Sequence, residues 1–164
     1  MSNSYGSSVD ILAGGLSGLA GGVFAGIVLE LTNAQHVLTQ AIPALFGLSI
    51  PATIVGWGLF LALSFGFGIL YAGLFAIVDP STTTPSGGGV IGAFYGLVLW
   101  LVVAVVFVPL ATSAVGYGGA PPFPYIDPVA LVGYVSYGII IGGFYAILTD
   151  YRFQAISSDP DVPA

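Results

Sequence analysis

The chain has 164 residues, of which 57% are hydrophobic and 5% are charged. A soluble domain usually carries about 25% charged residues, so this composition excludes a soluble globular exterior and predicts a chain surrounded by lipid. With seven acids, one base and no cysteine, the sequence also excludes nucleic-acid binding through a basic patch, disulfides and thiolate metal sites. An acidic chain without lysine is typical of high-salt organisms, where screening weakens the repulsion between carboxylates.

The first predicted membrane span covers residues 10–31. Residues 11–31 supply the about 20 apolar positions that a helix needs to cross a bilayer core of about 30 Å, and this run is too long for a cleavable signal peptide. Four glycines recur at four-residue spacing on one face: Gly14, Gly18, Gly22 and Gly26. Because a glycine face lets a second backbone approach closely, we predict that it packs against another helix.

A short amphipathic segment follows at residues 32–42. Its apolar side chains recur at helical spacing, and its opposite side is polar and includes His36. This pattern predicts a short helix in the membrane interface, with His36 toward water and with Val37 and Leu38 toward lipid or protein. Pro43 is expected to end this helix.

Three further spans are predicted, at residues 51–78, 88–108 and 129–150. Pro109 is expected to end or kink the third span, and residues 111–128 hold too many prolines and glycines for a regular helix. The third and fourth spans carry packing faces formed by Gly88, Gly92, Gly96, Gly138 and Gly142. The predicted fold is therefore an all-α polytopic membrane protein: one membrane domain, residues 1–164, with four transmembrane helices and a short interfacial amphipathic helix.

The glycine faces recur at a constant offset of 74 residues, which predicts an internal duplication. The residue pairs that share this offset include Gly14–Gly88, Gly18–Gly92, Gly22–Gly96, Gly68–Gly142, Tyr71–Tyr145 and Ala72–Ala146. We therefore predict two tandem two-helix repeats, at residues 11–78 and 85–152. Because each repeat holds an even number of spans, both copies are expected to insert in the same orientation, related by an axis along the membrane normal.

Four spans place both termini on one side of the membrane, together with the loop between the second and third spans. Arg152, the only basic residue, follows the fourth span. The positive-inside rule then places the termini in the cytoplasm, and we predict a multi-pass protein of the cell membrane. The loop at residues 111–128 is expected to lie outside and, through Phe123 and Tyr125, to form a docking surface.

Few residues are suited to carry chemistry. One histidine and no cysteine leave no predicted catalytic, cofactor-binding or metal-binding residue. Glu30, near the end of the first span, is an ionisable side chain close to membrane depth, which makes it a functional candidate. Intramembrane hydroxyls are expected to form hydrogen bonds between helices, and they include those of Tyr71, Tyr145, Tyr95, Tyr137, Ser17, Ser64 and Ser136. The alternative is a polar pathway that includes Glu30, Tyr71 and Tyr145.

The second half of the chain resembles a family of uncharacterised four-helix membrane proteins from halophilic archaea. The resemblance rests on residues 92–100 (Gly-Ala-Phe-Tyr-Gly-Leu-Val-Leu-Trp), on Pro109-Leu110, and on residues 133–146, which begin Gly-Tyr-Val-Ser-Tyr-Gly and end Gly-Gly-Phe-Tyr-Ala. Members often carry Gly-His before the Val-x-Tyr-Gly stretch, where this chain has Tyr134, so a role for that histidine does not carry over. The resemblance implies a membrane location and a four-helix layout, and it implies no activity.

These observations predict an integral membrane protein without catalytic activity. An excess of close-packing faces favours a helix-packing or accessory subunit of a membrane complex or a homo-oligomer. Its partners would be the lipid bilayer and other membrane subunits or a second copy of itself, and not nucleic acid. The alternative is a small oligomeric channel or carrier for a neutral solute or ion, which a continuous hydroxyl-lined cavity would distinguish.

Overall fold

The computed structural model describes residues 4–32, 34–48, 52–76 and 84–157, with side chains described between residues 11 and 150. This part of the chain is helical and contains no strand, which confirms the predicted all-α class. The helices long and apolar enough to cross a membrane within it are Ile11–Leu31, Thr53–Phe75, Pro85–Ala114 and Pro128–Asp150. The architecture is that of a multi-pass membrane protein with four spans.

The spans are built from α1 (Ser4–Leu31), α3 (Thr53–Phe75), α4 (Pro85–Leu99) and α6 (Pro128–Ser157). α4 continues through the π-helical segment η3 (Trp100–Phe107) into α5 (Val108–Ala114), so these three elements form one long span. A π-helical segment η1 (Val37–Ala41) and the short helix α2 (Ile42–Leu45) connect α1 to α3.

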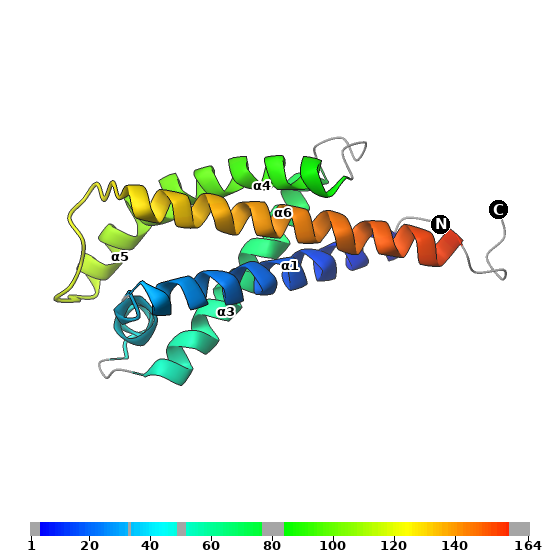
Figure 1. Cartoon of the computed structure of the whole chain (residues 1–164). Coiled ribbons are helices and arrows are strands. Elements are labelled where there is room, and N and C mark those ends of the chain that lie inside the picture. The colour runs from blue at the N-terminus through cyan, green and yellow to red at the C-terminus, as the bar shows by residue number, and fades with distance from the viewer. Residues whose placement is uncertain (1–3, 33, 49–51, 77–83, 158–164) are drawn as a thin grey trace.

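The helices are paired along the bundle. α1 lies against α3, α4 lies against α6, and α1 and α6 join the two pairs. The starts of α1 and α4 and the end of α6 lie at one end of the molecule, and α2 and α5 lie at the other (Figure 1). The first and last spans therefore have their outer ends on the same side, as an even number of spans requires.

α4 and α6 both begin with a proline that follows a residue with a side-chain oxygen acceptor. Thr84 precedes Pro85, and the Thr84 side-chain oxygen accepts a hydrogen bond of 3.1 Å from a first-turn backbone N–H. Asp127 precedes Pro128, and the Asp127 carboxylate accepts a similar bond of 2.9 Å. Proline suits the first turn because its missing N–H would have had no partner within the helix. The residue before it satisfies one of the N–H groups that remain.

Two further prolines, Pro43 and Pro109, lie inside a continuous helical path. The prediction that Pro43 ends its helix was wrong, because α2 continues through it, and Pro109 is likewise the second residue of α5. In both places the residue before the proline donates its N–H to the carbonyl five residues back, which is the π-helical pattern. The helical path therefore widens before each proline and then continues.

Each of these prolines leaves one upstream carbonyl without its usual donor, because proline has no N–H. In the first half that carbonyl belongs to Thr39, and it accepts a hydrogen bond of 3.1 Å from the N–H of Ala52. In the second half it belongs to Val105, and it accepts one of 3.3 Å from the N–H of Tyr125. In both halves, the chain that leads into the next span supplies the donor that the proline removed.

The connection between α1 and α3 differs from its predicted form. A helix was expected at residues 32–42, but helical structure runs over residues 37–45. Leu38 is fully buried and His36 is exposed. Leu38 lies against Gly56 of α3, where any side chain would collide with the Leu38 carbonyl. The segment is thus held against protein, with its one histidine on the outside.

Candidate functional site

α1 and α3 meet through small residues at backbone contact. A side chain on Gly14 would collide with the carbonyl of Gly68, because its Cβ would lie 2.6 Å from that oxygen. A side chain on Gly18 would collide with the carbonyl of Ser64, and a Cβ on Gly22 would lie 2.6 Å from the Cβ of Ser64. A larger residue on this face would push the helices apart.

α4 and α6 meet in the same manner. Gly92 lies against Gly138, so that a side chain on either would collide with the carbonyl of the other. Gly96 lies against the backbone of Tyr134. Each glycine predicted to pack lies at such a contact within the chain, with Gly26 placed under the ring of Trp57. The glycine face of α1 is therefore occupied inside one molecule.

The contacts of the two helix pairs correspond at the offset of 74 residues. Adding 74 to both members of the Gly14–Gly68 contact gives the Gly88–Gly142 contact. In the same way, adding 74 to both members of the Gly18–Ser64 contact gives the Gly92–Gly138 contact. This correspondence supports the duplication proposed for residues 11–78 and 85–152.

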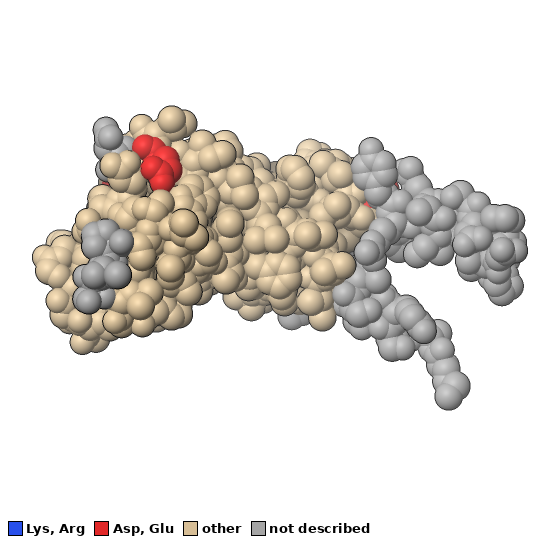
Figure 2. Space-filling model, turned by 90° about the horizontal axis from the view of Figure 1, so that it is seen from below, with Lys and Arg blue, Asp and Glu red and all other residues tan. Residues whose placement is uncertain are grey.

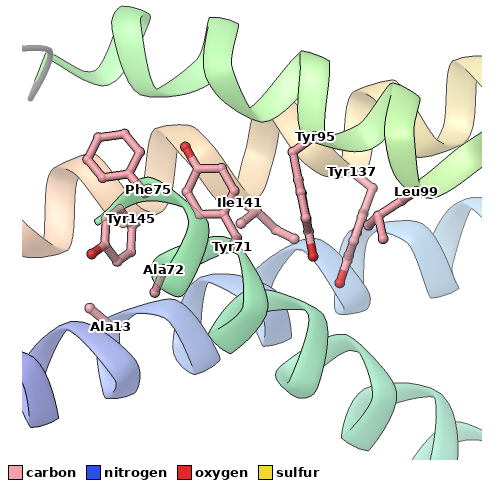
Figure 3. Packing of buried hydrophobic residues seen from close by; sticks show 9 residues of the cluster. All are labelled: Ala13, Tyr71, Ala72, Phe75, Tyr95, Leu99, Tyr137, Ile141 and Tyr145. Atoms are coloured by element: carbon pink, nitrogen blue, oxygen red, sulfur yellow. The ribbon is translucent and has the colours of Figure 1, made fainter. Parts of the chain in front are cut away.

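A cluster of buried aromatic rings lies between the two helix pairs (Figure 3). Tyr71 packs edge-on against Tyr145, with ring centroids 5.6 Å apart, and against Tyr95 at 5.3 Å. Phe75 extends the cluster, with its centroid 5.2 Å from that of Tyr145. Such edge-to-face contacts contribute about 0.5–1.5 kcal/mol each beyond the burial of area.

Three tyrosine hydroxyls of this cluster donate hydrogen bonds to backbone carbonyls of other helices. These bonds join Tyr71 to Gly88 (3.2 Å), Tyr95 to Phe67 (2.6 Å) and Tyr137 to Ser64 (3.2 Å). Hydrogen bonds between membrane helices are worth about 0.6–2 kcal/mol each. These three hydroxyls hold helices together.

Glu30 lies apart from this cluster, near the end of α1. Its carboxylate accepts a hydrogen bond of 3.3 Å from Nε1 of Trp57, whose ring lies over Gly26. Fourteen positions of α3 separate Trp57 from Tyr71, which is about 21 Å at about 1.5 Å per residue. The structure thus brings Tyr71 and Tyr145 together but does not bring Glu30 to them.

The loop before α6, residues 115–127, is tied to its neighbours through Tyr125. Besides its backbone bond to Val105, Tyr125 donates its hydroxyl to Oδ2 of Asp127 at 3.2 Å. Burial, and secondarily the Asp127 carboxylate, raise the pKa of Tyr125. Phe123 is exposed. Of the two aromatic residues predicted to form a docking surface, Phe123 therefore presents the freer ring.

The lateral surface is largely uncharged. On the flank seen in Figure 2, acidic side chains lie toward the ends and the long middle section is formed by uncharged residues. Among the described residues, no three His, Asp or Glu side chains lie together as metal ligands. The middle of this flank has the character of a surface that faces lipid.

From the sequence, Tyr95 and Tyr137 were counted among the hydroxyls expected to form hydrogen bonds between helices, and the structure shows one such bond for each. The 74-residue offset by itself does not mark these two tyrosines, because the positions that correspond to them hold Gly21 and Leu63. A signal for Tyr95 was present, since it lies between Gly92 and Gly96 at helical spacing and so near the packing face of α4.

Comparisons with protein-family models, with curated proteins and with solved structures gave no match. The resemblance of the second half to membrane proteins of halophilic archaea therefore stays a prediction. Any functional proposal rests on the contacts made within this chain.

Proposed function

We propose that this protein is a non-catalytic helix-packing subunit that assembles in the membrane through the outer face of α3, with a second copy of itself as the partner. The observation that carries the proposal is a row of small residues on α3 that no other described residue covers. The row consists of Gly58, Ala62, Gly66 and Gly73.

The α3 row lies away from the face that α3 presents to α1. Side chains added at Gly58, Gly66 or Gly73 would have no neighbour within 4 Å, and Ala62 is exposed. Only 17% of the most apolar stretch of α3 is buried, against 33–44% in the other three spans. α3 is thus the span with the most surface left for a partner.

Small-residue faces serve one purpose elsewhere in this chain, which is to hold a second helix at backbone contact. The α1–α3 and α4–α6 contacts both use them in this way. In lipid there is no hydrophobic force between helices, so close van der Waals contact at small residues is what drives association. A row with steps of four, four and seven residues lies on one helix face, and it also fits a copy of itself across a two-fold axis, the commonest symmetry of oligomers.

The α3 row is particular to one half of the chain. The positions of α6 that correspond to it hold Val132, Ser136, Ile140 and Ile147. Ser136 is small, but the side chains of Val132, Ile140 and Ile147 would keep another backbone at a distance. The proposed assembly therefore uses one face per molecule, which gives a closed dimer.

The alternative function, a small oligomeric channel or carrier for a neutral solute or ion, has less support from the geometry. Its wall would need free hydroxyls, but those of Tyr71, Tyr95 and Tyr137 are bound to backbone carbonyls. Ser17 likewise donates to the carbonyl of Ala13 at 2.7 Å in its own helix. Solute flux into vesicles that contain the purified protein would favour the channel.

Cysteine cross-linking in native membranes tests the proposed assembly. The chain has no cysteine, so each variant carries a single thiol. Gly66→Cys and Gly73→Cys should form disulfide-linked dimers on mild oxidation. Ile147→Cys is the matched control, because it occupies the position of α6 that corresponds to Gly73 and is exposed; it should stay monomeric.

A second variant separates assembly from folding. Gly66→Leu should abolish the dimer but should not lower the unfolding midpoint of the solubilised monomer, because no atom of the described residues lies within 4 Å of a Cβ at this position. Cross-linking at Ile147→Cys as strong as at Gly66→Cys, or an unaltered dimer in Gly66→Leu, would refute the α3 interface.

A further inference from the structure

The two helix pairs meet at two places, α1 against α6 and α3 against α4, and these two contacts differ in closeness. α1 packs closely against α6, whereas the corresponding helices α4 and α3 make only marginal backbone contact. One pair of corresponding residues accounts for this difference. Gly21 of α1 lets α6 approach, because a Cβ there would lie 2.9 Å from the ring of Tyr137. The corresponding position of α4 holds Tyr95, whose side chain keeps α3 at a distance.

An apolar hollow of about 200 Å³ lies in the space that results between α3 and α4. Tyr71 and Tyr95 contribute to its lining. Other lining residues, Leu74, Phe94 and Val98, are exposed on its outer side. The hollow, called here the α3–α4 groove, therefore opens between two membrane-spanning helices, where the surrounding medium is hydrocarbon.

The two tyrosines of the groove also set its width. Tyr71 reaches from α3 to the carbonyl of Gly88, and Tyr95 reaches from α4 to the carbonyl of Phe67. Because these bonds span the gap in both directions, they hold α3 and α4 about one tyrosine side chain apart. Because both hydroxyls donate to backbone carbonyls, the groove is left with an apolar lining.

This width decides between the two apolar occupants that a membrane offers. A helix with its side chains is about 10–12 Å across, so a helix of a second copy would have to break both tyrosine bonds to enter. A hydrocarbon chain is one methylene wide and can lie along the groove without disturbing them. Water is excluded, because apolar hollows stay dry.

We propose that the α3–α4 groove holds one hydrocarbon chain of a membrane lipid. The chain would contact aliphatic and aromatic side chains on both walls, and dispersion contacts that are individually small add up over its length. Corresponding residues with different side chains, Gly21 and Tyr95, would then give the two sides of the bundle different roles. On the Gly21 side, α1 would contact α6 directly. On the Tyr95 side, a lipid chain would lie between α3 and α4.

Retention of a brominated lipid tests this proposal, because bromine on a lipid chain quenches tryptophan fluorescence on contact. In a background with Trp57→Phe and Trp100→Phe, a single reporter is placed in the groove by Phe94→Trp or on α1 by Phe24→Trp. Phe24 is exposed and is not among the residues that line the groove. Each protein is reconstituted with dibrominated phosphatidylcholine and then extracted into a lipid-free steroid detergent, whose fused rings are wider than an alkyl chain.

Both reporters should be quenched in the bilayer, and only the groove reporter should stay quenched after extraction. Val98→Phe, which fills the groove, should let its fluorescence recover, whereas Val102→Phe should not. Val98 and Val102 are exposed to similar extents, 56% and 55%, but only Val98 lines the groove. Recovery of both reporters together, or retention that survives Val98→Phe, would refute the lipid site. A groove reporter shielded from bromine in the bilayer would show instead that protein fills the groove.

Discussion

Tyr71 and Tyr145, which are 74 residues apart in the sequence, contact each other ring to ring in the centre of the bundle, with centroids 5.6 Å apart. If the two halves are copies, residues that are equivalent and in contact must lie beside the axis that relates them. In Figure 3 the Tyr71 hydroxyl points up toward α4 and the Tyr145 hydroxyl points down toward α1, which fits that relation because α1 and α4 are the corresponding helices. The aromatic cluster thus marks the junction between the proposed repeats.

We expect Tyr71→Phe to lower the free energy of unfolding by about 0.6–2 kcal/mol, since it removes only the hydrogen bond to the carbonyl of Gly88. Tyr71→Ala should cost about 3–5 kcal/mol, because it also leaves a cavity at a residue that is 1% exposed. Reversible unfolding in bicelles measures both. Phe94→Ala is the control, since this ring is 68% exposed and its loss should have little effect.

The glycine contacts predict which glycines tolerate a larger side chain. Gly22→Leu should cost several kcal/mol, because the added side chain meets Ser64 of α3 and overpacking of a tight helix contact has no relief. Gly133→Leu on α6 should be tolerated, since nothing lies within 4 Å of its Cβ position. Equal unfolding midpoints for these two variants would contradict the tight α1–α3 contact.

Much of this architecture could be predicted from the sequence, because four apolar runs of bilayer length and glycines at four-residue spacing leave few alternatives. What escaped prediction depends on contacts between distant segments. Pro43 and Pro109 were expected to interrupt helices, since nothing local shows that Ala52 and Tyr125 supply the missing donors. The hydroxyl of Tyr95 was expected to bond to another helix, but its acceptor, the Phe67 carbonyl, could not be named from the sequence because it lies on a distant segment.

The sidedness of the protein can be tested with single cysteines at its two ends. Gly118 lies in the loop before α6, and Ser86 lies near the start of α4 at the opposite end; both are exposed. If the termini are cytoplasmic, Gly118→Cys should react with a membrane-impermeant maleimide added outside intact cells, and Ser86→Cys should react only after lysis. The reverse pattern would place the termini outside and would turn the exposed ring of Phe123 toward the cytoplasm.

The two prolines should control separate backbone hydrogen bonds. In Pro109→Ala, the alanine N–H can take the carbonyl of Val105 that Tyr125 now occupies, because an α-helix pairs each N–H with the carbonyl four residues back. The amide of Tyr125 should then exchange with solvent deuterium faster than in the parent protein, and the amide of Ala52 should be unchanged.

In Pro43→Ala the pattern should be reversed, since the carbonyl concerned belongs to Thr39 and its present donor is Ala52. Hydrogen exchange of fragments that contain each amide measures both effects, and each variant is the control for the other. If both amides exchange faster in either variant, the prolines act through general destabilisation. If neither amide exchanges faster in either variant, the new alanine N–H does not displace the N–H of Ala52 or Tyr125. The π-helical segments η1 and η3 then keep their form without proline.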